Sequence, residues 1–133
     1  MFRRFTFPRR SRIGGRGTFK TIRDSGIRES RGPITVWAVP NGASQMRLGI
    51  SIGRHVGTAV RRNRIKRLLR ESFRLMQRDI PRGYDVLVGV KPHAPLILAE
   101  YQKLLSSMIV RIHGKWEKQS QRPSAWAPPT PET

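Results

Sequence analysis

The stretch "RLGISIGRHVGTAVRRNRIKRLLRESFR", residues 47–74, decides the fold, because it predicts a strand, a turn and a long helix in immediate succession. Residues 46–53 alternate apolar side chains with polar or small ones, a period of two that is typical of a half-buried strand. The hydroxyl of Thr58, which follows a glycine, is suited to cap the free N–H groups at the start of a helix. We therefore predict a strand over 46–53 and a helix from about 58 to 78.

The predicted helix has two chemically different faces. At about 100° per residue, one face collects the apolar arc Ile65, Leu68, Leu69, Ser72, Phe73, Leu75 and Met76. The opposite face carries Asn63, Arg67, Arg70 and Arg74. Glu71 is the only acid between 58 and 78, so we expect ion pairs within the helix to leave most of this charge unbalanced. Like charges one turn apart repel each other, so the basic face indicates either an anionic partner or a solvated surface.

The flanking segments predict a small α+β domain. We expect a helix over 17–26, strands over 34–40 and 84–92, and a helix over about 98–114. The first helix would have Thr18 as its N-cap and would end at Gly26. The order is α-β-β-α-β-α with room for one more short strand, which gives a single sheet packed by helices.

Length and composition predict one domain with two extensions. The chain has 133 residues, enough for one domain with a real core. Residues 1–15 are basic and rich in glycine, which indicates an extended arm, and residues 16–116 form the predicted domain. Residues 117–133 are rich in proline and poor in apolar side chains, so we predict a disordered tail there.

The charge of the chain points to a polyanionic partner. Lys and Arg number 27 against eight Asp and Glu, which gives a formal net charge of +19. Such an excess attracts polyanions at long range. Arg greatly outnumbers Lys, and its planar fork binds phosphate and stacks on bases, which favours nucleic acid over an anionic membrane surface.

Other features suggest where the protein acts. The chain has no cysteine, which excludes disulfides and thiolate metal sites and fits a cytoplasmic protein. No stretch approaches the roughly 18 apolar residues of a membrane span. The N-terminus "MFRRFTFPRRSR" lacks the apolar region of a signal peptide, although a basic organelle transit peptide is an alternative.

The sequence offers little support for a catalytic site built from protein side chains. His55, His93 and His113 are far apart and lack metal-ligand spacing, and the acidic residues form no obvious pair. The chain contains no phosphate-binding P-loop and no G-x-S-x-G motif. We therefore expect no catalytic residue, no metal ligand and no small-molecule substrate.

Two features fit binding to nucleic acid. Asn63 lies between Arg62 and Arg64 near the helix N-terminus, where free N–H groups and the helix dipole attract anions. Phe19 and Trp37 are candidates for stacking on the bases of a single strand, although aromatic side chains at such positions are more often part of the core.

Residues 47–74 closely resemble the signature of the bacterial ribonuclease P protein subunit. That pattern runs from a Gly-hydrophobic-Ser strand through a basic pair and a V-G-x-A-V turn into an R-N-R helix. Here the R-N-R triplet is residues 62–64, and weaker similarity extends from about residue 11 to 113. The sequence departs from the pattern at Arg23, where the family often has an aromatic residue, and at His55, the second member of the basic pair. The "RIGGRG" segment before Phe19 is also richer in glycine than usual.

The resemblance implies a function in tRNA processing. Ribonuclease P removes the 5′ leader from precursor tRNA, and its RNA subunit carries the chemistry with bound Mg²⁺. The protein would bind the RNA subunit through Arg61, Arg62, Asn63, Arg64, Lys66, Arg67, Arg70 and Arg74. It would hold the single-stranded leader between the sheet and the first helix through Phe19, Trp37, Ser51 and Arg54.

The resemblance also implies a left-handed βαβ crossover, similar to that in the second domain of ribosomal protein S5, although such crossovers are right-handed in most proteins. Two other functions stay open. A structural RNA-binding protein of ribosomal type would share the basic helix but lack leader recognition. An independent DNA-binding regulator is a third class, but no helix-turn-helix arrangement supports it.

Overall fold

The computed structural model describes residue 13 and residues 16–43 and 45–120 of the chain. The elements are α1 (Arg16–Ser25), β1 (Ile27–Arg31), β2 (Ile34–Pro40), β3 (Arg47–Ile52), the short 3-10 helix η2 (Arg54–Val56), α2 (Ala59–Met76), β4 (Tyr84–Val90) and α3 (Leu98–Ser120). The predicted order is confirmed, and β1 supplies the additional short strand.

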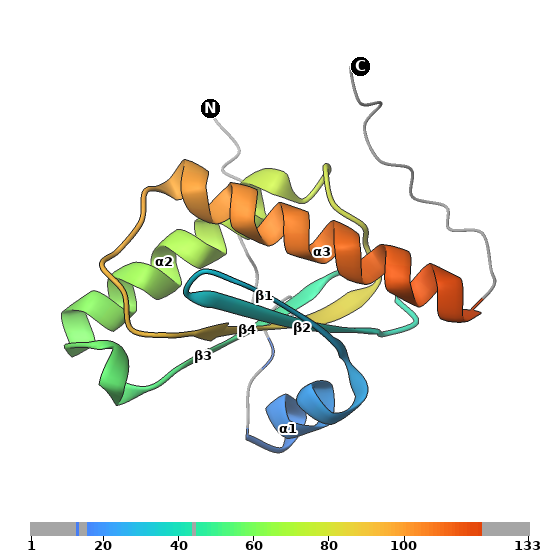
Figure 1. Cartoon of the computed structure of the whole chain (residues 1–133), viewed down its shortest axis with the longest axis horizontal. Coiled ribbons are helices and arrows are strands. Elements are labelled where there is room, and N and C mark those ends of the chain that lie inside the picture. The colour runs from blue at the N-terminus through green and yellow to red at the C-terminus, as the bar shows by residue number, and fades with distance from the viewer. Residues whose placement is uncertain (1–12, 14–15, 44, 121–133) are drawn as a thin grey trace, which may run out of the picture.

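The four strands form one mixed sheet in the order β1-β2-β4-β3. β2 pairs antiparallel with β1 and with β4, whereas β3 pairs parallel with β4. The helices α2 and α3 cover one face of the sheet, and α1 lies on the other (Figure 1). We call these the helical face and the α1 face.

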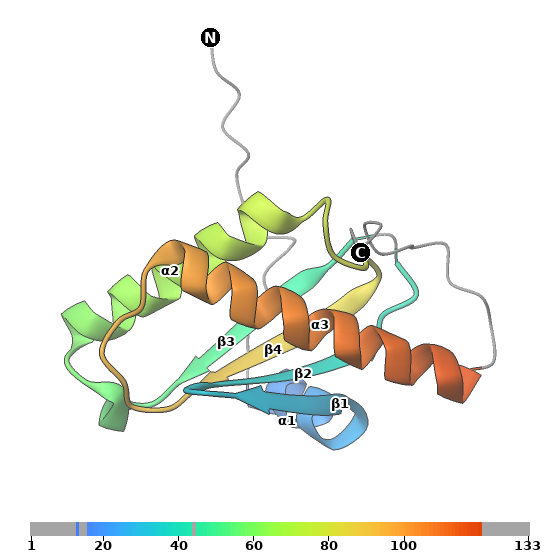
Figure 2. The same cartoon turned by 45° about the horizontal axis from the view of Figure 1, so that its top comes forward.

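The connection from β3 through α2 to β4 is a left-handed crossover. Figure 2 shows the sheet from the helical face, with α2 in front of it. When this picture is rotated in its plane until the parallel strands β3 and β4 point upward, β4 lies to the left of β3. The fold class and the hand implied by the resemblance are therefore confirmed. This hand is rare because a right-twisted strand normally favours the opposite return.

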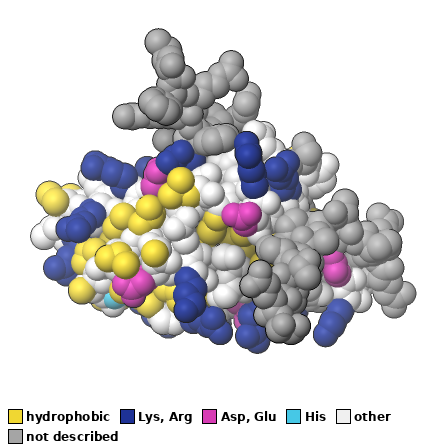
Figure 3. Space-filling model, turned by 90° about the horizontal axis from the view of Figure 1, so that it is seen from above, with side chains coloured by type: hydrophobic (Ala, Val, Ile, Leu, Met, Phe, Trp, Pro, Cys, Tyr) yellow, Lys and Arg dark blue, Asp and Glu magenta, His cyan; other side chains and the backbone are white. Residues whose placement is uncertain are grey.

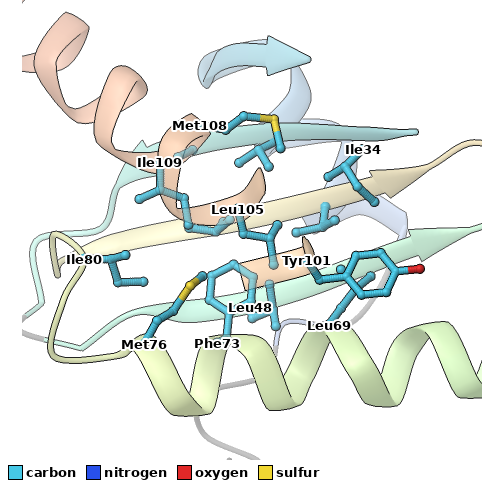
Figure 4. Packing of buried hydrophobic residues seen from close by; sticks show 14 of the residues in the cluster. Ile34, Leu48, Leu69, Phe73, Met76, Ile80, Tyr101, Leu105, Met108 and Ile109 are labelled. Atoms are coloured by element: carbon cyan, nitrogen blue, oxygen red, sulfur yellow. The ribbon is translucent and has the colours of Figure 1, made fainter. Parts of the chain in front are cut away.

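The main core lies between the sheet and the helices α2 and α3. Alternate residues of β2, β3 and β4 point into it, as the strand periodicity predicts. Figure 4 shows Leu69, Phe73 and Met76 of α2 facing Tyr101, Leu105 and Ile109 of α3 above the strands. A second, smaller cluster lies on the α1 face and contains Ile13, Ile22 and Leu87.

Three local expectations need correction. The first helix begins at Arg16, so Thr18 is inside it and is not its N-cap; its end before Gly26 is confirmed, and the Gly26 N–H donates to the Ile22 carbonyl at 2.7 Å. Leu75 was expected in the buried arc, but it lies at the edge of that arc and is 45% exposed.

The third correction concerns α3, which continues to Ser120 instead of ending near Gly114. The indole Nε1 of Trp116 donates to the Ala38 carbonyl at 2.9 Å, and Lys115 and Arg111 lie 3.2 and 3.0 Å from Glu29. These long-range contacts hold the last turns against β1 and β2. Residues 117–120 of the predicted tail are therefore helical, and residues 121–133 lie outside the described residues.

The outer surface of the helical face is mixed. Figure 3 shows an apolar strip on this face with Lys and Arg at its margins. Val60, Leu75 and Ile97 are the large apolar side chains that are exposed within the described ranges. None of the helices in those ranges is long and apolar enough to cross a membrane.

Candidate nucleic-acid interface

The N-terminus of α2 is built by a glycine and a threonine. The Thr58 side chain accepts a hydrogen bond from the Arg61 N–H at 3.2 Å, which confirms the predicted N-cap. Gly57 has a φ of 152°, and a Cβ there would come within 2.7 Å of the Arg61 Cδ. The turn therefore requires glycine, and the aliphatic part of Arg61 packs over it.

Arg62 differs from its neighbours because it is tied to the turn. Its Nε donates to the Gly57 carbonyl at 3.3 Å, and its side chain is half-buried. Arg62 therefore links the conformation of the turn to the position of a charge at the helix N-terminus.

The first half of α2 presents charge that is not balanced locally. Arg61, Asn63, Arg64 and Arg67 are exposed, and Lys66 is half-buried. Within the described ranges, none of their side chains forms a hydrogen bond or an ion pair with the protein. These donors point to solvent, as an anion-binding surface requires.

The second half of α2 is different. The Arg74 Nε donates to Glu71 at 2.9 Å, and the second guanidinium nitrogen contacts the other carboxylate oxygen. The hydrogen bond to Glu71 raises the pKa of Arg74. The single acid of the helix therefore compensates this arginine, one turn after the half-buried Arg70.

The two aromatic candidates meet on the α1 face. Phe19 of α1 and Trp37 of β2 are half-buried and pack against the small cluster formed with Leu87. The Phe19 ring lies over Gly49, where an added Cβ would be 2.6 Å from its Cε1. Both aromatic side chains therefore contribute to the core while part of each stays accessible.

Ser51 and Arg54 connect this face to α2. Ser51 follows Gly49 by two residues on β3, so it lies on the same α1 face, and it aligns with Gly89 of β4. Arg54 is exposed in η2, which joins β3 to the turn before α2. Of the leader-binding residues expected from the sequence, Phe19, Trp37 and Ser51 therefore share the α1 face, and Arg54 lies in the segment that connects β3 to the basic N-terminus of α2.

A different group on the α1 face is committed to structure. Asp85 accepts two hydrogen bonds from Arg47, at 2.8 and 2.6 Å, and one from Asn41 at 3.0 Å. The hydrogen bond and charge of Asp85 raise the pKa of Arg47. Arg47 is thus not an available cation, although it begins the stretch of sequence with the clearest pattern.

Sequence reasoning missed the contribution of β1 to this face. The register places Arg28 opposite Trp37, and Ser30 opposite Thr35. The signal was weak because β1 has only five residues, "IRESR", and most of them are polar. In the part of the chain that the structure describes, no three His, Asp or Glu side chains gather in a way that could hold a metal ion.

Comparison with known proteins assigns the chain to a family. The family model described as "Ribonuclease P" matches residues 7–113. The ribonuclease P protein component of Desulfovibrio desulfuricans is 33% identical over 109 residues, covering 80% of this chain and 84% of that protein. The ribonuclease P protein component of Dictyoglomus thermophilum is 33% identical over 114 residues, covering 86% and 92% of the two chains.

Solved structures give the same result. The RNase P protein from Thermotoga maritima superposes with a TM-score of 0.68 at 30% identity, covering 76% of this chain and 96% of that one. The Staphylococcus aureus RNase P protein superposes with a TM-score of 0.66 at 28% identity, covering 77% and 94%.

Proposed function

This chain belongs to the ribonuclease P protein family, and we propose that it binds the RNA subunit through the first half of α2 and the 5′ leader of precursor tRNA through the α1 face. The observation that carries this proposal is the direct connection, along the chain, between two surfaces of different chemistry. Uncompensated cations at the N-terminus of α2 are joined through η2 to a sheet face that offers aromatic rings and hydroxyl groups.

The division of labour follows from the chemistry of each surface. Arg61, Arg64 and Arg67 supply exposed guanidinium groups that can bind phosphate bidentately. Phe19 and Trp37 supply flat apolar surfaces, on which bases of any sequence can stack. The α2 surface therefore suits a structured RNA rich in phosphate, and the α1 face suits an unpaired strand.

The proposal assigns cleavage to the RNA subunit with Mg²⁺ and gives the protein a binding role. The protein offers no clustered acids or histidines within its described ranges that fit a metal ion, whereas RNA phosphates are natural ligands of Mg²⁺. The protein lowers the Mg²⁺ requirement by supplying positive charge where phosphates crowd together. Cleavage of precursor tRNA by the protein alone, after rigorous removal of RNA, would contradict this assignment.

The decisive experiment is reconstitution with a bacterial ribonuclease P RNA at low Mg²⁺. We expect the protein to stimulate release of the 5′ leader at the mature end of the tRNA, with no cleavage by either component alone. RNA binding without stimulation would instead favour a general RNA-binding protein.

Leader recognition is tested with Phe19→Ala and Trp37→Ala in the reconstituted complex. We expect each variant to weaken binding of leader-bearing tRNA by about 5- to 150-fold, since stacking contributes about 1–3 kcal/mol per base, and to leave mature tRNA unchanged. Trp116→Phe is the matched control, because Trp116 lies on the opposite face of the sheet. Equal losses for both tRNAs would contradict leader recognition.

A further inference from the structure

β1, the edge strand beside β2, divides its side chains between the two faces of the sheet. On the helical face, Glu29 contacts Arg111 and Lys115 of α3, and Arg31 donates to Ser107 of α3 at 3.1 Å. Because successive side chains of a strand alternate, Arg28 and Ser30 lie on the α1 face. Each aligns with a residue of β2 that belongs to that face, Trp37 and Thr35 respectively.

The register aligns one small or hydroxyl-bearing residue on each strand. Ser51 of β3 pairs with Gly89 of β4, Gly89 pairs with Thr35 of β2, and Thr35 pairs with Ser30 of β1. Thr35 is only 5% exposed, and its hydroxyl bonds to that of Ser30 at 2.9 Å. These four aligned residues form a row across the sheet, and the exposed hydroxyl at its β1 end belongs to Ser30.

Positive charge lies beside this end of the row without a local counterion. Arg28, two residues before Ser30 on the same face of β1, is exposed, and within the described ranges it forms no hydrogen bond or ion pair. The neighbouring acids are already engaged, since Asp24 binds Lys20 at 2.8 Å and Glu29 points to the helical face. On the β3 side, the exposed Arg54 follows the hydroxyl of Ser51 by three residues. On the β1 side of Trp37, the hydroxyl of Ser30 likewise has an exposed arginine close by, Arg28.

We propose that β1 extends the leader-binding surface beyond Trp37, with Arg28 binding a leader phosphate and Ser30 donating a hydrogen bond to the same segment. This inference rests on the proposed function. The RNA subunit, which cleaves, binds α2 beside β3, so the leader enters the sheet at β3 and reaches β1 with its nucleotides farther from the cleavage site. Arg28 is therefore a specificity residue for leader length.

The test uses the reconstituted complex and precursor tRNAs whose leaders are shortened one nucleotide at a time. For the unaltered protein, affinity should rise with leader length and then level off. Arg28→Ala should level off at a shorter leader, with about a five- to tenfold loss for the longest leaders and unchanged affinity for the shortest. The salt dependence for the longest leaders should also fall by about 0.7 in slope, the value of one phosphate contact on a single strand.

Arg31→Ala is the matched control, because it removes an arginine from the same strand on the opposite face. It should follow the unaltered protein at every leader length. Arg28→Lys should retain the salt slope but lose part of the affinity, because an ammonium group cannot reproduce bidentate binding.

The outcomes separate the two proposals. In the first outcome, the unaltered protein binds long leaders more tightly than short ones, and Arg28→Ala shows the same dependence of affinity on leader length as Arg31→Ala. The role of Arg28 is then wrong, and the proposed function stands. If Arg28→Ala weakens all substrates equally, including mature tRNA, Arg28 acts through general charge, and the length assignment is again wrong. An unaltered protein that does not distinguish leader-bearing from mature tRNA would overturn both.

Discussion

The indole of Trp37 lies over the backbone of Gly89, so closely that a Cβ on Gly89 would be 2.9 Å from Cζ3 and 3.2 Å from Cη2 of the ring. The two residues belong to neighbouring antiparallel strands, and Gly89 is two positions beyond the residue that pairs with Trp37. A side chain at position 89 would occupy the place of the ring. Gly89 thus determines where the proposed stacking surface lies.

Gly89→Ala should therefore move the indole and weaken leader binding without touching the leader itself. We expect about a fivefold or greater loss of affinity for leader-bearing tRNA, and a loss of about 1 kcal/mol in the free energy of unfolding from the overpacked site. Gly114→Ala is the control, because an added Cβ there meets nothing within 4 Å. It should stabilise α3 by up to about 1 kcal/mol and leave leader binding unchanged. Equal leader affinity for the two variants would contradict the prediction.

The two halves of α2 should contribute unequally to binding of the RNA subunit. Arg67→Ala removes an exposed cation that has no protein partner in the described ranges, so the slope of log affinity against log salt should fall by about 0.9. Arg74→Ala should change this slope much less, because Glu71 already compensates the charge of Arg74. Filter binding to the RNA subunit over a range of salt concentrations measures both slopes. A larger effect for Arg74 would show that its ion pair opens on binding.

Tyr84 should make the protein sensitive to alkaline pH. Burial, together with the charge of Glu117, raises the pKa of Tyr84 to about 12 from an ordinary 10.0. The unfolded chain therefore loses the phenol proton near pH 10, whereas the folded chain keeps it to about pH 12. The stability that this proton provides is complete below pH 10 and is lost between about pH 10 and 12, at a cost of about 2–3 kcal/mol.

Tyr84→Phe should flatten the fall in the free energy of unfolding between pH 10 and 12, as measured by urea denaturation. Tyr101, whose pKa is also raised by burial, is present in both proteins, so the difference between them reports Tyr84. At neutral pH the variant should be less stable by about 1 kcal/mol, because the phenol bonds to the His113 Nδ1 at 2.7 Å. Parallel curves for the two proteins would contradict this assignment.

Trp116 should stabilise the domain although it lies beyond the matched family segment. Trp116→Phe removes the hydrogen bond from the indole to the Ala38 carbonyl and should cost about 1 kcal/mol in the free energy of unfolding. Urea denaturation at neutral pH measures this loss. An unchanged midpoint would mean that water replaces the indole at the carbonyl.

The sequence predicts those parts of the fold in which local features, such as hydrophobic periodicity and helix caps, agree with the burial seen in the structure. Leu48 begins a clean alternation, and Thr58 starts α2 as its local chemistry predicts. The end of α3 differs from the predicted end near Gly114 because Trp116 and Lys115 are held by residues of β1 and β2 that are distant in sequence. No local signal at Gly114 reveals those contacts.

The candidate interface also contains both residues that are predictable from local sequence and a residue whose position depends on tertiary structure. The R-N-R triplet is readable because a helix N-terminus is a local feature, and the ion pair of Arg74 with Glu71 is predictable from their spacing of three residues. Arg28 could not be placed from sequence, because its position beside Trp37 depends on the register between β1 and β2. A one-residue shift would have moved it to the opposite face.

The position of β4 has a consequence for how the protein is made. β4 is the last strand of the sheet to leave the ribosome, yet it lies between β2 and β3. Until residues 84–90 emerge, the hairpin of β1 and β2 has no contact with β3 through the sheet, and the apolar side of α2 has no α3 to cover it. Co-translational folding of this domain therefore waits for its final third, and a highly basic, unfolded chain must be kept from the nearby ribosomal RNA during that interval.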